Sequence, residues 1–426
     1  MKTLIPKILA VSIAAACALP LAANATNGYF LPGYGAAAVG MGGVGVAFAQ
    51  DSLAAAANPA GIVDVGMRAD LGFGIFNPVR SAATGTASES GQASPAGYNG
   101  AADSSNRYYM MPSAGYVMPW DDKLSFGIAL VGNGGMNTTY KPNFFNGGDP
   151  KNSNTLGIDL MQMLVPITAA YKVDEHNAFG MSLVLGAQRF AARGIRAFHI
   201  ISNEPKHLTN NGHDFAQGAG ARVGWRGKYF DDKLTLGATY ASKVYMSRFS
   251  KYSGLFADRG SFDVPANYAV GIAVKATPAT TVAFDVERIL YKGVPSVANR
   301  GPGATIPFAN SLGLPDGMGF GWTNQTVYKL GVAYQYNPHW VLRAGYNYGK
   351  SPIPGDQVTF NTLAPAVVER HATLGFTYSP NKSTEITLAY LHAFSNTQSA
   401  TNQNIVGGVD IQMYQNDVEF SYGWKF

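Results

Sequence analysis

The chain has 426 residues, of which 46% are hydrophobic and only 13% are charged. That charged fraction is about half of what a soluble globular protein carries, and a mean hydropathy of -0.02 is too low for a bundle of membrane-spanning helices. The hydrophobic content also excludes a disordered chain, which could not bury enough apolar surface. With 50 glycines and 12% aromatic residues, the composition predicts an all-β protein and favours a membrane-spanning β-barrel.

The first residues predict a secretory signal peptide. Lys2 and Lys7 precede a short, mostly apolar run over residues 8–21, and Ala23-Asn24-Ala25 follows as a cleavage site. The apolar run is too short for a helix that spans a bilayer, which needs about 20 residues. We therefore expect residues 1–25 to be removed and the protein to be exported.

The predicted mature chain contains no cysteine. Its sequence predicts neither a nucleic-acid-binding surface nor a membrane-spanning helix. The single cysteine, Cys17, lies in the signal, so disulfides and thiolate metal sites are excluded. The remaining basic residues are scattered, whereas nucleic acid requires a basic patch. The longest small-residue run, 33–66, is rich in glycine and contains Asp51 and Asp64. A chain of this kind enters a membrane as a closed barrel, because an unpaired backbone group in lipid costs several kcal/mol.

Alternating hydrophobicity marks the strands, most clearly at the C-terminus. Large apolar residues alternate there with small or polar ones, a period of two that suits a wall between lipid and a lumen. One face carries Tyr414, Asn416, Val418, Phe420, Tyr422, Trp424 and Phe426, and the other carries Gln415, Asp417, Glu419, Ser421, Gly423 and Lys425.

The same pattern predicts fourteen strands. We place them at residues 67–80, 106–120, 123–140, 157–172, 177–193, 215–230, 233–249, 261–275, 280–291, 326–336, 340–350, 368–378, 384–394 and 411–426. The connections alternate between tight turns, most of them with Asp, Asn or Pro, and long loops. Short turns at one rim and long loops at the other are typical of outer-membrane barrels. We therefore predict a membrane-spanning 14-stranded antiparallel β-barrel over residues 67–426.

The residues before the first strand predict a plug. A barrel of fourteen strands is too wide to be filled by its own wall side chains. Residues 26–66 are rich in Ala, Gly and Asn-Pro, a composition that favours a compact irregular segment over a strand. We expect this segment to occupy the lumen as an N-terminal hatch.

Several motifs resemble those of FadL-type transporters. The start Thr26-Asn27-Gly28-Tyr29-Phe30, the run beginning Gly33-Tyr34-Gly35-Ala36-Ala37 and the later Asn58-Pro59-Ala60-Gly61 resemble the N-terminal hatch of that family. Leu342-Arg343-Ala344-Gly345-Tyr346-Asn347-Tyr348 and Arg370-His371-Ala372-Thr373-Leu374-Gly375 resemble its barrel strands. The resemblance covers essentially the whole mature chain.

The resemblance implies an outer-membrane barrel that takes up long-chain fatty acids or, in other branches, aromatic hydrocarbons. It also implies that Asn58, Pro59, Ala60 and Gly61 belong to the hatch, and that ligand leaves sideways through a kink in the third strand. That strand contains Gly132, Asn133, Gly134 and Gly135. Glycines inside a strand weaken its ladder and favour a bulge. The alternative is that they only make room for neighbouring side chains.

Two further groups of residues are candidate ligand contacts. A carboxylate needs Arg or Lys near the pocket, and Lys141, Lys151, Arg193 and Arg196 lie at strand ends or in loops expected to be external. The alternative for each is a contact with lipopolysaccharide or solvent. Loop residues Phe144, Phe145, Leu255 and Phe256 could form an apolar groove, or only pack their loops.

Other activities have weaker support. Gly40-Met41-Gly42-Gly43-Val44-Gly45 matches a dinucleotide-binding pattern but lacks the strand and helix that the site requires. His207 and His213 show no metal spacing, and no Ser and His are arranged as a catalytic pair. We predict a non-enzymatic, cofactor-free monomer in the outer membrane of a Gram-negative bacterium. Its partners would be a hydrophobic ligand, lipid, lipopolysaccharide and the barrel-assembly machinery. The alternatives are an aromatic hydrocarbon channel, a general porin for polar solutes, or a surface adhesin.

Overall fold

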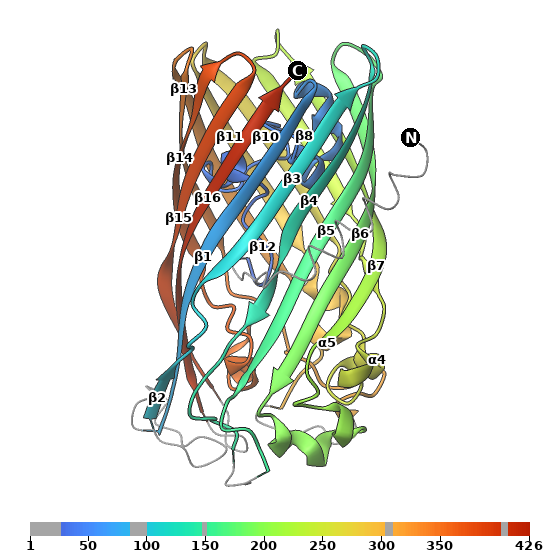
Figure 1. The fold of residues 1–426 in the computed structure, drawn as a ribbon, viewed down its shortest axis with the longest axis vertical. Coiled ribbons are helices and arrows are strands. Elements are labelled where there is room, and N and C mark those ends of the chain that lie inside the picture. The colour runs from blue at the N-terminus through green and yellow to red at the C-terminus, as the bar shows by residue number, and fades with distance from the viewer. Residues whose placement is uncertain (1–26, 86–99, 147–150, 303–309, 402–407) are drawn as a thin grey trace.

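The computed structural model describes residues 27–85, 100–146, 151–302, 310–401 and 408–426; the predicted signal peptide, residues 1–25, lies outside them. Fourteen long antiparallel strands form one sheet, and each pairs with its neighbours along the chain. The last strand pairs with the first from Arg68↔Lys425 to Ala83↔Asp410, which closes the barrel (Figure 1). In the described parts of the chain, no helix has the length and apolar character needed to cross a bilayer.

The long strands are β1 (Arg68–Thr84), β3 (Tyr109–Pro119), β4 (Leu124–Asn137), β5 (Gly157–Lys172), β6 (Asn177–Arg193), β7 (Asp214–Tyr229), β8 (Leu234–Ala241), β10 (Asn267–Thr277), β11 (Thr280–Ile289), β12 (Gln325–Asn337), β13 (Trp340–Gly349), β14 (Arg370–Asn381), β15 (Thr384–Ser399) and β16 (Asp410–Lys425). Two short strands, β2 (Gly100–Asp103) and β9 (Tyr245–Met246), pair with β1 and β7. The short helices are α2 (Ala36–Val39), α3 (Ala54–Ala57), η1 (Pro59–Asp64), η3 (Arg196–Ile201), η4 (Pro205–His207), η5 (Ser250–Tyr252), α4 (Ala257–Gly260), η6 (Tyr291–Gly293), α5 (Pro295–Ala298), η8 (Gly355–Gln357) and η9 (Phe360–Thr362).

The alternating residues of β16 face opposite sides of the wall. Tyr414, Val418 and Trp424 are exposed outward, whereas Gln415 and Asp417 are buried on the inner side. An outward apolar face and a polar inner face are what a barrel in lipid requires. The predicted fourteen-stranded barrel is therefore confirmed.

Strand boundaries differ from the prediction by a few residues at most strands, and by more at two places. The strand expected over residues 233–249 divides into β8 and β9, because Arg222 of β7 pairs with Ala241 and Gly218 pairs with Met246. Between these two pairs the β8–β9 segment therefore has one residue more than β7, which is a β-bulge. The strand expected to begin at residue 261 begins at Asn267, and β2 was not expected.

The two ends of the barrel differ as the connection lengths predict. The C-terminus lies among short turns at the top of Figure 1, and the long loops with α4 and α5 lie at the bottom. In one short turn, Asp121 Oδ1 accepts hydrogen bonds from the backbone N–H groups of Leu124 (2.7 Å) and Lys123 (2.8 Å). These bonds lower the pKa of the Asp121 carboxyl. The Asp-rich turns are therefore built as tight turns require.

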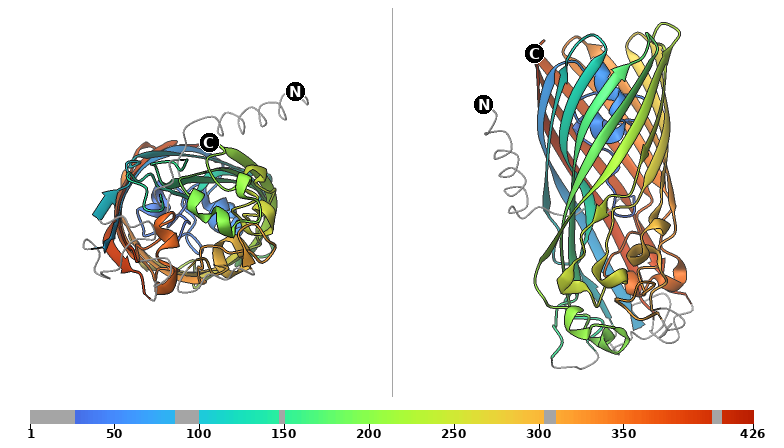
Figure 2. Two further views of the ribbon diagram at one scale, coloured as in Figure 1. Left: turned by 90° about the horizontal axis from the view of Figure 1, so that it is seen from below. Right: turned by 90° about the vertical axis from the view of Figure 1, so that its right-hand side faces the viewer.

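Residues 27–66, named here the plug segment, lie inside the ring of strands (Figure 2). Its helix η1 contacts β5, β6 and β7, while α2 contacts β14 and β15 on another part of the wall. Only short helical turns interrupt this irregular segment. The plug segment thus crosses the lumen near the end that carries the short turns (Figures 1 and 2).

Candidate functional site

A pair of glycines in the wall receives the Asn58-Pro59 backbone. Gly180 of β6 and Gly224 of β7 are partners in register. A Cβ on Gly180 would lie 2.4 Å from the carbonyl carbon of Pro59, and one on Gly224 would lie 2.0 Å from Asn58 Oδ1. Both distances are far inside van der Waals contact. Glycine is therefore required at both positions for the plug segment to lie this close to the wall.

Two more glycine pairs on other strands serve the plug segment in the same way. Each pair joins neighbouring strands in register, and a Cβ on either member would overlap the plug segment. They are Gly237 with Gly271 against Val46, and Gly331 with Gly345 against Met41 and Gly42. The plug segment is thus seated against three separated parts of the wall.

Asn58 organises the plug segment through three hydrogen bonds. Its Nδ2 donates to Val46 O (2.7 Å) and to Trp225 O in β7 (2.9 Å). Its Oδ1 accepts from Ala60 N (3.1 Å), so that Asn58 is the N-cap of η1, with Pro59 in the first turn. Asn is a favoured N-cap, and Pro is favoured directly after it. The Asn-Pro pair therefore begins a helix and ties it to the wall.

Wall side chains also accept hydrogen bonds from the backbone of the plug segment. Each accepting atom belongs to a different strand, which fixes the segment on several sides. The bonds run from Ser52 N to Asp70 (2.9 Å), from Gly45 N and Val46 N to Asp285 (2.8 and 3.0 Å), and from Gly42 N to Thr373 (2.8 Å).

The ladder between β4 and β5 shifts register at the glycine cluster. Gly132 pairs with Met163 and Gly134 with Gln162, so Asn133 is an extra residue on the β4 side. Gly134 has a φ of 145°, which only glycine adopts without strain. Asn133 is buried, and its Oδ1 accepts a hydrogen bond from Tyr34 Oη (2.9 Å). Whether ligand is released at this bulge stays a prediction.

The start of the plug segment pairs with the bulge. Tyr29 O accepts from Gly135 N (3.2 Å), and Leu31 N donates to Asn133 O (3.1 Å). Phe30 forms a bridge with Gly134. We call residues 27–34 the tip of the plug segment, because they satisfy backbone groups that the bulge frees.

Beside the bulge, β3 and β4 separate. Their pairing ends at Ala114↔Leu130, and the chains meet again where Ser105 N donates to Thr139 O (2.9 Å). Between these points, residues 106–113 and 131–138 share no backbone pairing in the described structure. A side-chain bond does cross the gap, from Tyr109 Oη to Asn137 Oδ1 (3.0 Å). We name this unpaired stretch the seam window.

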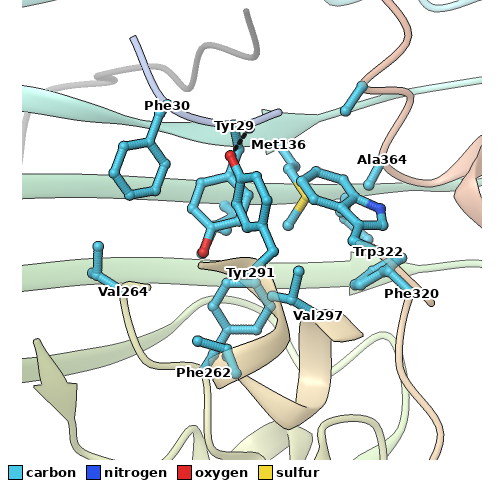
Figure 3. Packing of buried hydrophobic residues seen from close by; sticks show 14 of the residues in the cluster. Tyr29, Phe30, Met136, Phe262, Val264, Tyr291, Val297, Phe320, Trp322 and Ala364 are labelled. Atoms are coloured by element: carbon cyan, nitrogen blue, oxygen red, sulfur yellow. Dashed lines mark hydrogen bonds between the residues drawn. The ribbon is translucent and has the colours of Figure 1, made fainter. Parts of the chain in front are cut away.

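An aromatic cluster fills the lumen beside the tip (Figure 3). The ring centres of Tyr29 and Tyr291 lie 5.3 Å apart, and those of Tyr291 and Trp322 lie 5.1 Å apart. Tyr291 Oη accepts from Tyr29 N (3.2 Å) and donates to Asn27 O (2.5 Å). Phe262 also packs against Tyr29, at 6.1 Å between ring centres. The tip is therefore an integral part of an apolar core between the plug segment and the long loops.

The predicted ligand contacts lie outside this cluster. Lys141, Lys151 and Arg193 are exposed, and Arg196 is half-buried. Arg196 and Lys151 belong to neighbouring loops, since Arg196 N donates to Asn152 Oδ1 (3.4 Å). Their role toward a ligand stays a prediction.

The four predicted groove residues are buried rather than open to solvent. Phe144, Phe145, Leu255 and Phe256 are each at most 4% exposed. Phe256 packs on Phe190 with ring centres 4.6 Å apart. These side chains form loop packing in this structure, so a groove would require the loops to separate.

Sequence reasoning missed the groups that surround the seam window and the core. No motif marked these residues, because their partners are distant in the chain; they are Tyr109, Asn137, Tyr291 and Trp322.

Among the described residues, no three His, Cys, Asp or Glu side chains form a metal cluster.

Residues 12–290 and 313–422 match the sequence family described as outer membrane protein transport protein (OMPP1/FadL/TodX). This chain belongs to that family. Its members are transport channels for hydrophobic small molecules in the outer membrane of Gram-negative bacteria. No curated protein sequence matches the chain.

Solved structures of similar fold span nearly the whole chain. The toluene transporter TodX of Pseudomonas putida has a TM-score of 0.70 at 21% identity, over 93% of this chain and 99% of that one. A FadL homologue of Pseudomonas aeruginosa has a TM-score of 0.67 at 16% identity, over 93% and 98%. The toluene transporter TbuX of Ralstonia pickettii has a TM-score of 0.63 at 20% identity, over 93% and 99%. At these identities the likeness establishes the fold alone.

Proposed function

We propose that this family member takes up hydrophobic small molecules, with long-chain fatty acids as the leading substrates, and releases them sideways through the seam window. The observation that carries the proposal is the loss of backbone pairing between residues 106–113 and 131–138. In lipid an unpaired strand edge is costly. A gap at this position therefore needs a reason, and passage of a ligand into the bilayer supplies one.

The path that we propose is apolar except at the Tyr109–Asn137 bond across the seam window. Ligand enters among the long loops, meets the aromatic cluster around Tyr291 and Trp322, and leaves at the seam window. Outside the wall, Ile75 and its register partner Met110 are 44% and 56% exposed, so the exit opens among apolar side chains. Each buried CH₂ of an acyl chain gains about 0.8 kcal/mol, a gain that a water-filled pore could not provide.

We propose further that the plug segment acts as the family hatch and that only its tip moves. The body, residues 40–64, is held by the glycine pairs and by polar bonds to several strands. The tip pairs with the bulge itself. An equilibrium between a docked and a displaced tip would close and open the pocket behind the seam window.

Crosslinking across the seam window tests lateral release. The variant Tyr109→Cys/Asn137→Cys places two thiols on opposite sides of the gap, and a short bis-maleimide joins them. Cells expressing the crosslinked protein should lose uptake of labelled oleate, and the uncrosslinked variant should retain it. The matched control is Thr168→Cys/Ser182→Cys, since these residues are partners on the intact β5–β6 seam. Undiminished uptake after complete crosslinking of the seam window would refute lateral release.

A monoaromatic hydrocarbon is the second candidate substrate. Its support is the aromatic lining of the lumen (Figure 3) together with the similarity to two toluene transporters. Competition between labelled oleate and toluene for the purified protein separates the two substrates.

Large ion conductance in planar bilayers would instead favour a porin. A monomeric state, contact with lipopolysaccharide and insertion by the barrel-assembly machinery stay predictions.

A further inference from the structure

A polar hollow lies on the outer side of the wall at the long-loop end. Strand β6 keeps one register with β5 along its whole length, so its odd-numbered residues all face outward, as the exposed Phe179 and Met181 show. Ala191 and Arg193 belong to the same outward row. They line the hollow together with Asn106, Asn137, Thr138, Thr139, Thr155, Gly157, Ile158 and Asp159.

The hollow lies at the height where lipid headgroups begin. The outward residues of β6 are apolar from Phe179 to Ala187, and Arg189 is the first charged one. The strand from Phe179 to Arg189 is about 33 Å long. At the tilt of about 40° that is typical of such barrels, it rises about 25 Å, which is the height of their apolar band. Asp159 of β5, paired with Arg189 at 3.0 Å, lies at the same boundary. Since the long loops of outer-membrane barrels are external, this boundary belongs to the outer leaflet.

The charges around the hollow favour an anion. The Asp159 carboxylate accepts hydrogen bonds from Arg189 Nη2 (3.0 Å) and Asn137 Nδ2 (2.7 Å), and lies 2.8 Å from His213 Nε2. Its negative charge is therefore compensated. Arg193 is exposed at the rim and forms no ion pair within the parts of the chain that the structure describes. The hollow thus has one positive charge available for a ligand.

The rest of the lining is mostly neutral and polar. Thr139 and Thr155 contribute hydroxyl groups and Asn106 contributes an amide, groups that form hydrogen bonds with the hydroxyls of a sugar. The hollow of about 70 Å³ has room for about five water molecules. That space suits a phosphate group, which has five heavy atoms. Size, charge and polar lining together match a phosphate carried on a sugar.

We propose that the hollow binds the phosphorylated sugar headgroup of an outer-leaflet lipid, with Arg193 as the phosphate ligand. The planar guanidinium matches phosphate geometry and binds two oxygens at once. The acyl chains of the lipid lie along the apolar row of β6 below. This inference goes beyond the proposed transport, because headgroup binding does not require lateral release. The bound lipid stands at the edge of the seam window, since Asn137 lines the hollow and also accepts the Tyr109 bond across the gap.

Three probes test the assignment. Purified full-length protein in non-ionic detergent is titrated with bisphosphorylated lipid A, with lipid A from which both phosphates have been removed, and with inorganic phosphate. Native mass spectrometry measures the bound fraction. The wild type should bind lipid A about tenfold more tightly than the dephosphorylated form, and inorganic phosphate more weakly than lipid A. Arg193→Gln should remove most of the preference for phosphorylated lipid. Thr155→Val, which removes one lining hydroxyl at nearly constant volume, should weaken lipid A binding about threefold.

The matched control is Arg370→Gln, because Arg370 is an exposed arginine at the long-loop end of β14 and does not line the hollow. It should alter the affinity for none of the probes. An unchanged preference for phosphorylated lipid in Arg193→Gln would overturn the proposal, as would equal affinity of the wild type for the two forms of lipid A. Inorganic phosphate bound as tightly as lipid A would assign the hollow to a free anion instead.

If Arg193→Gln does not fold, Thr155→Val decides, and an unchanged affinity for lipid A in that variant would refute the site. None of these measurements involves oleate uptake. Failure of the proposed transport would therefore be recognised separately, by uptake that persists after the seam window is crosslinked.

Discussion

Tyr109 Oη in β3 donates a hydrogen bond of 3.0 Å to Asn137 Oδ1 in β4, at a height where the two strands share no backbone pairing. The same Asn137 donates through Nδ2 to Asp159 of β5 at 2.7 Å. One side chain therefore bridges the gap, and the next strand holds its partner in place. A side-chain bond of this kind can break and re-form without rupture of the sheet.

The first prediction concerns that bridge. Tyr109→Phe retains the ring but removes the hydroxyl, so the bond to Asn137 is lost. A hydrogen bond of this kind contributes about 0.5–1.5 kcal/mol, which corresponds to an opening of the seam window favoured by up to about tenfold. We expect faster initial uptake of labelled oleate at limiting concentration. Tyr116→Phe is the control, because Tyr116 lies in the part of β3 that is paired with β4, opposite Ile128. Slower uptake in Tyr109→Phe would contradict the role of the bridge.

The second prediction concerns the glycine pairs. In Gly180→Ala the new Cβ would meet the Pro59 carbonyl carbon at 2.4 Å, so the plug segment must shift away from the wall. We expect a rise in ion conductance in planar bilayers while the barrel remains folded. Gly132→Ala is the matched control, since a Cβ there has no neighbour within 4 Å. Equal conductance in the two variants would show that the glycine pair does not seat the plug segment.

The sequence was sufficient to predict the wall. Strong alternation, as in β16, is a local signal that depends only on which face meets lipid. The boundaries of β5, residues 157–172, were predicted to the residue for this reason. The division of β8 from β9 was missed, because a bulge depends on the register with β7 and not on local composition.

The interior was harder to predict, because it depends on pairs of distant residues. Gly180 and Gly224 are ordinary glycines until the register places them opposite one another under Pro59. Arg80, at the end of the first predicted strand, gave no sign that it would donate to Tyr109 Oη (3.1 Å), since that contact depends on how the strands pack. The Asn58 motif suggested a plug, but the partners of its amide come from the tertiary fold.

The third prediction concerns the tip. Tyr291→Phe removes the hydroxyl that accepts from Tyr29 N and donates to Asn27 O. The buried Tyr29 N–H group is then unsatisfied, at a cost of about 1–3 kcal/mol, whereas Asn27 O keeps the bond from Phe30 N (3.1 Å). We expect faster hydrogen–deuterium exchange over residues 27–34 and unchanged exchange over residues 54–64. Tyr348→Phe in β13 is the control. Unchanged exchange at the tip would contradict an anchoring role for Tyr291.

The fourth prediction concerns pH. Burial, and to a smaller extent the nearby Asp70, raises the pKa of the Asp51 carboxyl from 3.8 to about 7, while Arg68, the bond from Leu53 N and Arg343 oppose the shift. Asp51 belongs to the plug segment and is ionised more readily when that segment is displaced into water. At a pH below 3.8, the ordinary pKa, the carboxyl is protonated in both states, so docking of the plug segment carries no free-energy penalty from Asp51. The penalty grows as the pH rises toward 7, and is constant above it.

Hydrogen exchange over residues 40–64, corrected for the intrinsic effect of pH, measures this penalty. One pKa unit corresponds to about 1.36 kcal/mol, or tenfold in an equilibrium. We expect protection to fall by at least about tenfold between pH 5 and pH 8. Asp51→Asn has no ionisable group at this position and can still accept the hydrogen bond that Leu53 N gives to Asp51 (2.9 Å). Its protection should not change over the same range. A pH dependence that persists in Asp51→Asn would assign the effect to another group in the lumen.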